Sequence, residues 1–126
     1  LEMTLPIAAG VIRTLKVNAD RMAAALDDGL LATDLADYLV RKRIPFRESH
    51  RLVGQVVRLA LERGVSLREL TLPDFKAISE AFEANLYEVF DFRRAVEARR
   101  CRGGTATVAV REQIERAKEI ASLRSQ

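Results

Sequence analysis

The residues able to carry out chemistry in this chain of 126 residues are few. His50 is the single histidine, so a hydrolytic triad would have only this side chain as its base. It falls on an expected helix over residues 46–63, where we expect it to be partly buried and hydrogen-bonded rather than catalytic. Cys101, the single cysteine, has an arginine on each side but no designated base, and it cannot form an internal disulfide. One histidine and one cysteine also predict no zinc or haem site.

Acidic residues recur in close pairs, which can hold a metal ion or perform acid–base catalysis. The pairs are Asp27 with Asp28, Asp34 with Asp37, and Glu80 with Glu83. Helix capping and a solvated helix surface account for such residues without a catalytic role. We therefore expect these pairs to form no metal site.

A glycine pair near the end of the chain resembles a phosphate-binding turn. The segment "GGT" at residues 103–105 leads into an expected helix, whose N-terminus favours anions. It lacks the longer glycine pattern and the Lys-Ser/Thr ending of a P-loop. We expect Gly103 and Gly104 to end one helix and Thr105 or Thr107 to cap the next, with at most a weak anion site.

A basic cluster surrounds a helix–turn–helix pattern and supports an alternative reading, a nucleic-acid-binding helical module. Its members are Arg41, Lys42, Arg43, Arg47 and Arg51. Against this reading, the turn contains Pro45, and the helix after it is apolar over much of its circumference. The whole chain has 21 basic and 18 acidic residues, a net charge of +3, without the one-sided excess typical of nucleic-acid binders.

Composition also bears on the setting of the protein. No apolar run approaches the roughly 20 residues of a membrane-spanning helix. A free cysteine and no signal peptide favour a reducing, cytoplasmic compartment. Because the chain opens at Leu1 inside the amphipathic stretch "LEMTLPIAAGVIRTL", we expect it to be a piece of a longer protein.

Nearly every segment has helical spacing, so the expected fold is all-α, with many short helices in a compact domain. Pro6 suits the first turn of a helix whose apolar positions are Ile7, Val11, Ile12 and Leu15. Asn18 is the expected N-cap of a second short helix, which the acidic-glycine run at 27–29 should end.

Residues 30–50 carry the densest set of helix signals. Thr33 is the expected N-cap of a third helix, with Asp34 in its first turn. The expected buried positions are Leu35, Tyr38 and Leu39. Ile44 precedes proline and should leave the helical region, after which Pro45 starts a longer helix.

That longer helix should end at Gly64, a residue suited to a C-terminal stop. Its expected buried stripe is Leu52, Val53, Val56, Val57, Ala60 and Leu61. Two further helix starts follow, Ser66 with Glu69 at capping-box spacing and Thr71 with Asp74. The second should carry Phe75, Ile78 and Phe82.

The last third of the chain is less regular. Residues 84–92 suit either helix or a short extended piece, and Asp91 should cap the helix that follows. After the Gly103–Gly104 break, a final helix carries Val110, Ile114, Ala117 and Ala121 on one side and charges on the other.

Several of these blocks together resemble a known family. "GLLATDLADYLVRKRIPFRESHRLVGQVVRLALERG" is similar to the C-terminal region of argininosuccinate lyases and the related delta-crystallins, in the fumarase–aspartase superfamily. "PIAAGVIRTLKVNADRMAAAL", "SLRELTLPDFKAISEAF" and "RCRGGTATVAVREQI" resemble family segments in the same order. The residues that carry the signature are Thr33, Asp34, Tyr38, Pro45, Gly64, Gly103, Gly104 and Thr105.

The resemblance implies an all-α, homotetrameric enzyme that cleaves argininosuccinate into arginine and fumarate by β-elimination, without a cofactor. It implies that residues 1–16 are the end of a central helical-bundle domain and residues 17–126 a C-terminal helical domain. The family's catalytic serine lies in a Gly-Ser-Ser loop and its catalytic histidine in a Thr-Ser-His motif, and neither motif occurs in this sequence. No catalytic residue is therefore assigned, His50 is not the family histidine, and we expect the chain alone to be inactive. A structural, crystallin-like relative stays open as a further alternative.

Three positions depart from the family pattern. Arg43 stands where the family usually has glycine, Gln55 where lysine is common, and Thr107 where proline is common. If position 43 has a left-handed backbone, arginine there costs about 1 kcal/mol relative to glycine.

Overall fold

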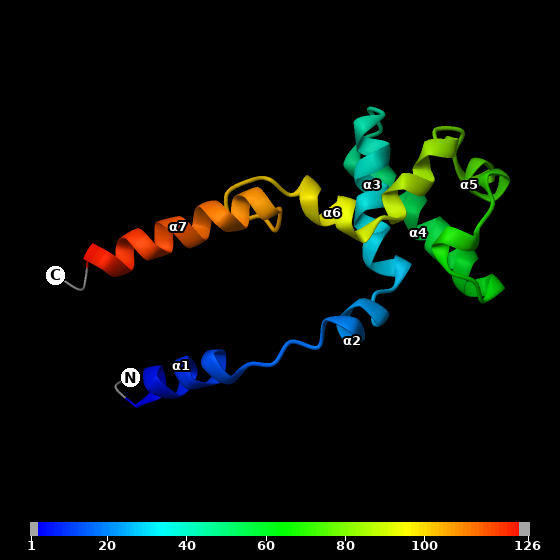
Figure 1. The fold of residues 1–126 in the computed structure, drawn as a ribbon. Helices are drawn as coiled ribbons and strands as arrows, with labels where there is room; N and C mark the ends of the chain where they lie inside the picture. Colours follow the sequence, from blue (N-terminus) through cyan, green and yellow to red (C-terminus); the bar gives the residue numbers. More distant parts are fainter. Residues whose placement is uncertain (1–2, 124–126) are drawn as a thin grey trace.

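The structure, a computed structural model, describes residues 3–123, and every regular element in that range is helical. Figure 1 shows a cluster of helices with longer arms extending from it. The α-helices are α1 (Thr4–Thr14), α2 (Ala19–Ala24), α3 (Ala32–Arg41), α4 (Phe46–Arg63), α5 (Leu72–Ile78), α6 (Phe92–Ala98) and α7 (Thr107–Leu123). Short 3-10 helices are η1 (Asp28–Leu31), η2 (Leu67–Glu69) and η3 (Ala84–Phe90). The all-α prediction is confirmed.

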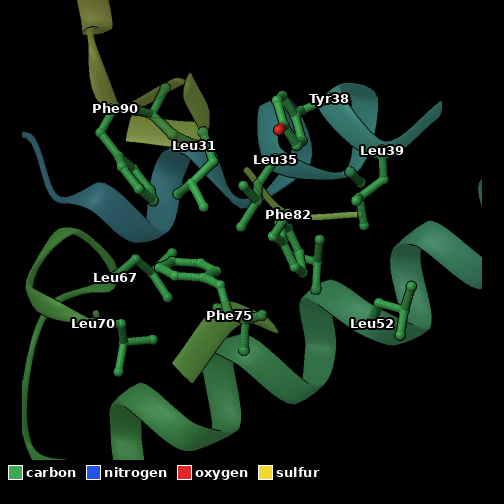
Figure 2. Packing of buried hydrophobic residues seen from close by; sticks show 14 of the residues in the cluster. Leu31, Leu35, Tyr38, Leu39, Leu52, Leu67, Leu70, Phe75, Phe82 and Phe90 are labelled. Atoms are coloured by element: carbon green, nitrogen blue, oxygen red, sulfur yellow. The ribbon is translucent and has the colours of Figure 1, made fainter. Parts of the chain in front are cut away.

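The hydrophobic core lies between α3, α4, α5 and the three 3-10 helices, and its centre is aromatic. Phe75 and Phe82 are fully buried, with ring centroids 5.3 Å apart and an edge-on orientation. Tyr38 lies parallel to Phe82 from the α3 side, at 6.3 Å between centroids. Figure 2 shows aliphatic side chains from several helical segments packed around these rings. They include Leu31, Leu35, Leu52, Leu67 and Leu70.

Helix α4 packs most of its predicted stripe into this core. Leu52, Val53, Val56 and Ala60 are buried, but Leu61 is 76% exposed, so its prediction was wrong. His50 is also exposed, with only the tilted ring of Phe46 beside it at 6.2 Å, so the prediction of a partly buried histidine was wrong as well. The inward position of that turn belongs to Ser49, which is fully buried and donates its hydroxyl to the carbonyl of Ile44.

Helix α3 begins differently from the prediction. Thr33 is exposed inside the helix and caps nothing, because α3 continues directly from η1 without a break. The capping residue is Asp27, whose Oδ1 accepts the Gly29 N–H at 2.8 Å ahead of η1. The acidic-glycine run therefore starts the next helical segment, and α2 ends earlier, at Ala24. Asp34 does lie in the first turn of α3, as predicted.

Most other predicted caps are confirmed. Asn18 accepts the Arg21 N–H at 3.1 Å, and Asp91 accepts the Arg94 N–H at 3.0 Å. Capping boxes form at Ser66–Glu69 and at Thr71–Asp74. Residues 84–90, for which an extended piece was one alternative, form the 3-10 helix η3 instead. Its side chains Leu86 and Phe90 are buried in the core.

Two helices end in the same backbone motif but with different residues. Gly64 has φ of +65° after α4, and Arg43 has φ of +68° after α3. In each case the next residue donates its N–H to the carbonyl five residues earlier, Val65 to Ala60 at 3.1 Å and Ile44 to Leu39 at 3.2 Å. This is the Schellman arrangement, in which glycine normally takes the left-handed position. The predicted strain at Arg43 is therefore present in the structure.

The arms of the molecule contribute little to the core. Helices α1 and α2 bury no residue, and α7 buries only Ala109. Figure 1 shows α1 and α7 extending away from the cluster formed by α3, α4 and α5. The apolar positions Ile7, Val11 and Ile12 of α1 are each more than half exposed.

The shared motif makes a direct stability comparison possible. We expect Arg43→Gly to raise the free energy of unfolding by about 1 kcal/mol, because it removes a Cβ from a left-handed position. Gly64→Ala should lower it by about 1 kcal/mol for the opposite reason. Arg43→Ala keeps the Cβ and should stay within about 0.5 kcal/mol of the parent chain. Urea unfolding followed by circular dichroism measures all three, and equal values for Arg43→Gly and Arg43→Ala would contradict the assignment.

The capping boxes predict a pH dependence. Hydrogen bonds from the Thr71 side chain and backbone, and then from Arg63, hold the pKa of Asp74 below its ordinary value of 3.8. A carboxylate whose pKa is lower in the folded state stabilises the fold above its unfolded pKa, and this is lost as pH falls through the folded value. Asp74→Asn should therefore lose less stability than the parent chain when the pH is lowered from about 7 to about 3. Urea unfolding at each pH measures this loss. Glu80→Gln, which removes a carboxylate outside both boxes, should keep the parent's dependence.

Candidate functional site

The signature residues of the 30–50 segment are structural, and Tyr38 is the clearest example. Its side chain is 8% exposed and its hydroxyl joins α3 to the segment before and within η3. The hydroxyl donates to Asn85 Oδ1 at 2.7 Å and accepts the Glu83 N–H at 3.2 Å. Figure 2 shows the ring of Tyr38 beside Phe82, with the hydroxyl oxygen at its edge. The ring therefore packs in the core, and the hydroxyl is engaged in two structural hydrogen bonds.

Lys42 reinforces the same junction from the end of α3. Its Nζ lies 2.6 Å from Glu83 Oε1 and 4.9 Å from the centre of the Tyr38 ring. Burial of the ammonium opposes its charged form, but the hydrogen bonds to Glu83 and Tyr38 prevail, so the pKa of Lys42 is raised. The same hydrogen bond lowers the pKa of Glu83. Lys42, a member of the basic cluster, is therefore held by contacts within the fold.

The other members of the basic cluster are not brought together into one binding surface. Arg51 is held by Glu48 on its own helix, 2.6 Å away. Arg43 occupies the strained turn, and Arg41 and Arg47 are exposed. The face of α4 that a groove-binding helix would need is buried in the core at Leu52, Val53 and Val56. This geometry does not favour the nucleic-acid-binding module.

Asp34 is likewise structural. Its Oδ2 accepts from Arg99 at 3.0 Å, which connects the first turn of α3 to the end of α6 across 65 positions of sequence. The carboxylate raises the pKa of the Arg99 guanidinium. The acidic pair at 27 and 28 is structural as well. Asp27 caps η1, and Asp28 forms an ion pair with Arg68 at 3.4 Å. Among residues 3–123, no three histidine, cysteine, aspartate or glutamate side chains converge to hold a metal ion.

The glycine turn is closed tightly, but the prediction that it ends the preceding helix was wrong, because α6 already ends at Ala98 with Arg99 as its C-cap. Gly103 has φ of +84°, and a Cβ at Gly104 would lie 2.2 Å from the carbonyl oxygen of Arg99. Thr105 donates its hydroxyl to the Val96 carbonyl at 3.4 Å rather than capping α7. The first N–H of α7, from Thr107, is instead accepted by Glu97 Oε1 at 3.2 Å, and the Thr107 hydroxyl donates to the same oxygen. The hydrogen bonds from the hydroxyl and then from the N–H lower the pKa of Glu97. A side-chain carboxylate of the protein therefore takes the place where a bound anion would sit.

The remaining candidates stay apart. Cys101 is exposed beside this turn, and its thiol has no designated partner among the described residues. His50 is exposed on α4, and neither His50 nor Cys101 lines the cleft between α3, η3 and α6, to which Asp34 belongs. The described part of the chain holds no helix long and apolar enough to cross a membrane.

One cleft does gather signature residues. It has a volume of about 290 Å³ and lies where α3 faces η3 and α6. Asp34, Tyr38 and Arg41 line one side, and Asn85, Val89 and Arg94 are among those lining the other. Sequence reasoning missed Asn85 and Arg94, because nothing in their local pattern marks them as neighbours of residues about fifty positions earlier.

The Tyr38 junction predicts a measurable cost. Tyr38→Phe removes a buried hydroxyl that makes two hydrogen bonds, so we expect the free energy of unfolding to fall by about 1–2 kcal/mol. Tyr87→Phe is the matched control, since that hydroxyl donates only to the Leu70 carbonyl at 2.8 Å. It should cost about 1 kcal/mol or less. Urea unfolding of both variants makes the comparison, and a Tyr38→Phe chain as stable as the parent would refute the junction.

Comparison with known proteins bears on the whole arrangement. The family model described as argininosuccinate lyase C-terminal matches residues 29–97, the range that holds the core and the junction. The argininosuccinate lyase of Chloroflexus aurantiacus is 53% identical over 116 residues, which cover 92% of this chain and 25% of that protein. The argininosuccinate lyases of a Roseiflexus species and of Saccharomyces paradoxus are 52% and 48% identical, over 94% of this chain and 26% of each relative.

The chain thus spans about a quarter of the length of the curated relatives it matches. Their match runs through the signature segment, the two capping boxes and the aromatic core rather than through one short motif. The chain belongs to the argininosuccinate lyase family and corresponds to its C-terminal region.

Proposed function

We propose that this chain is the C-terminal segment of an argininosuccinate lyase, an enzyme that cleaves argininosuccinate into arginine and fumarate in arginine biosynthesis. The observation that carries the proposal is the family match over residues 29–97 together with about half identity to named lyases over nearly the whole chain. The reaction itself is a β-elimination, in which a base removes a proton next to a carboxylate and an acid assists the departing nitrogen.

In this proposal the segment supports the enzyme without supplying its acid or base. Three of the carboxylates that could transfer protons are already engaged: Asp34 with Arg99, Glu83 with Lys42, and Glu97 with the start of α7. His50 is exposed on α4 with no carboxylate or hydroxyl partner among the described residues. The catalytic groups are therefore expected on the other three quarters of the relatives' length, and this segment alone is expected to be inactive.

The proposed division of the chain places residues 1–16 at the end of a central helical bundle and residues 17–126 in the C-terminal domain. The described part of the first piece, helix α1, supports this, because it buries no residue and exposes Ile7, Val11, Ile12 and Leu15. Leu1 and Glu2 lie outside the described residues. An amphipathic helix of this kind gains stability by packing against other helices, as in the homotetramer that we propose for the complete enzyme. A cytoplasmic location is part of the same proposal.

The proposal has a test by transplantation. In the Chloroflexus aurantiacus enzyme, the C-terminal region would be replaced by this chain, and fumarate release from argininosuccinate would be followed by ultraviolet absorbance. We expect a soluble chimera with activity within about tenfold of the parent enzyme, a change of 1.4 kcal/mol or less in transition-state stabilisation. The same chimera with Phe82→Ala should lose activity and solubility, because the core loses a fully buried ring at a cost of about 3–5 kcal/mol.

The isolated chain serves as the second arm of that test. Purified at the same concentration and assayed with argininosuccinate, it should release no fumarate above the buffer blank. Fumarate release by the isolated chain would contradict its supporting role. A chimera that is folded and soluble but inactive would contradict the assignment to this enzyme.

A further inference from the structure

The cleft between α3, η3 and α6 has a chemical character that its structural role does not account for. Its α3 side is formed by Asp34, Tyr38 and Arg41, which recur every three to four residues and so share one face of the helix. Its opposite side includes the small aliphatic side chains of Val89, Ala95 and Ala98. The volume of about 290 Å³ is at the lower end of the range for small-molecule sites.

Most charges that line the cleft are already neutralised by partners. Asp34 is paired with Arg99 at 3.0 Å, and Arg94 with Glu88 at 2.5 Å. Lys42, which lines the cleft, is paired with Glu83, which does not. The exception is the guanidinium of Arg41, which forms no ion pair or side-chain hydrogen bond with any described residue. The cleft therefore has a free cation at its edge and no free carboxylate.

A second donor is held in place beside it. The hydroxyl of Tyr38 donates to Asn85 Oδ1 at 2.7 Å, which fixes the carboxamide with its oxygen toward the tyrosine. The amide nitrogen of Asn85 is left without a partner among the described residues, although the side chain lines the cleft. The junction that stabilises the fold thus also fixes a side chain with a free neutral N–H donor in the lining of a cleft edged by Arg41.

From these features we infer that the cleft binds a short aliphatic carboxylate, with Arg41 and Asn85 holding the carboxylate and Val89, Ala95 and Ala98 contacting the aliphatic chain. Arginine matches the geometry of a carboxylate with two N–H donors in one plane. The apolar wall is the reason for preferring an organic acid to inorganic phosphate, which would leave that wall exposed to water. This site is separate from the proposed lyase function and does not depend on it.

Nuclear magnetic resonance of the 126-residue chain, labelled with nitrogen-15, tests the inference. The probes are butyrate, its uncharged counterpart butyramide, and inorganic phosphate. We expect butyrate to shift the amide signals of residues 34–41 and 85–98 in a saturable way, and butyramide and phosphate to leave them unchanged at the same concentrations. Saturable shifts of these signals by phosphate but not by butyrate would overturn the assigned ligand class, and no saturable shift by any probe would overturn the site.

A pair of variants separates specific binding from a general attraction of anions. Arg41→Gln should weaken butyrate binding about tenfold or more, as expected when a charged hydrogen-bonding partner is lost. Arg58→Gln removes the same charge from an exposed position of α4 that does not line the cleft, and it should bind like the parent chain. Equal weakening in both variants would show that butyrate responds only to net charge. Circular dichroism of each variant confirms that the helices are retained.

Discussion

The fold depends on the burial of two phenylalanine rings that come from opposite ends of one short segment. Phe75 lies within α5 and Phe82 beyond its end, yet both are fully enclosed and meet edge to face at the centre of the core. Burying such a ring contributes about 1.5–3 kcal/mol, and the edge-on contact adds up to about 1.5 kcal/mol. Helices α3 and α4 each place an apolar stripe against this pair, so their orientation follows from it.

The same ring pair explains why the junction at Tyr38 lies where it does. Tyr38 stacks on Phe82, and its hydroxyl then reaches the backbone at Glu83 and the side chain of Asn85. The polar end of the tyrosine is therefore positioned by an apolar contact. Tyr38, which the sequence predicts to be buried, is a packing residue whose hydroxyl also forms hydrogen bonds with the chain around it. The proposed binding role belongs to the next residue in this network, Asn85, whose amide group is held by the Tyr38 hydroxyl.

Local signals predicted the helix boundaries well because a cap involves residues no more than four positions apart. Asn18, Asp91 and the two capping boxes behave as their spacing indicates. The left-handed backbone at Arg43 was anticipated only through the glycine that the family usually has there. The errors at Thr33, His50 and Leu61 have a different origin. Each depends on how a helix is rotated against its neighbours, or on the continuation of α3 from η1.

The candidate site was less accessible to sequence reasoning than the fold. Composition gives nearly equal numbers of acidic and basic residues, but it does not indicate which charge meets which. Lys42 points into the junction, whereas Arg41, its neighbour in sequence, lies at the edge of the cleft without a partner. That difference depends on the packing of η3 and the residue before it, Glu83, against α3. The long-range pair between Asp34 and Arg99 belongs to the same class of contact.

The order of the helices along the chain has a consequence for how the molecule folds. The main packing partners, α3 with α4 and α4 with α5, are consecutive elements, so most of the core can assemble from neighbours in sequence. Chains with such local topology fold rapidly, because little loop-closure entropy is lost before contacts form. The contacts of Tyr38 with Asn85 and of Asp34 with Arg99 span 47 and 65 positions. The core also contains long-range contacts, those of η3 with η1 and α3, so the cleft and the core are completed by the same docking of η3.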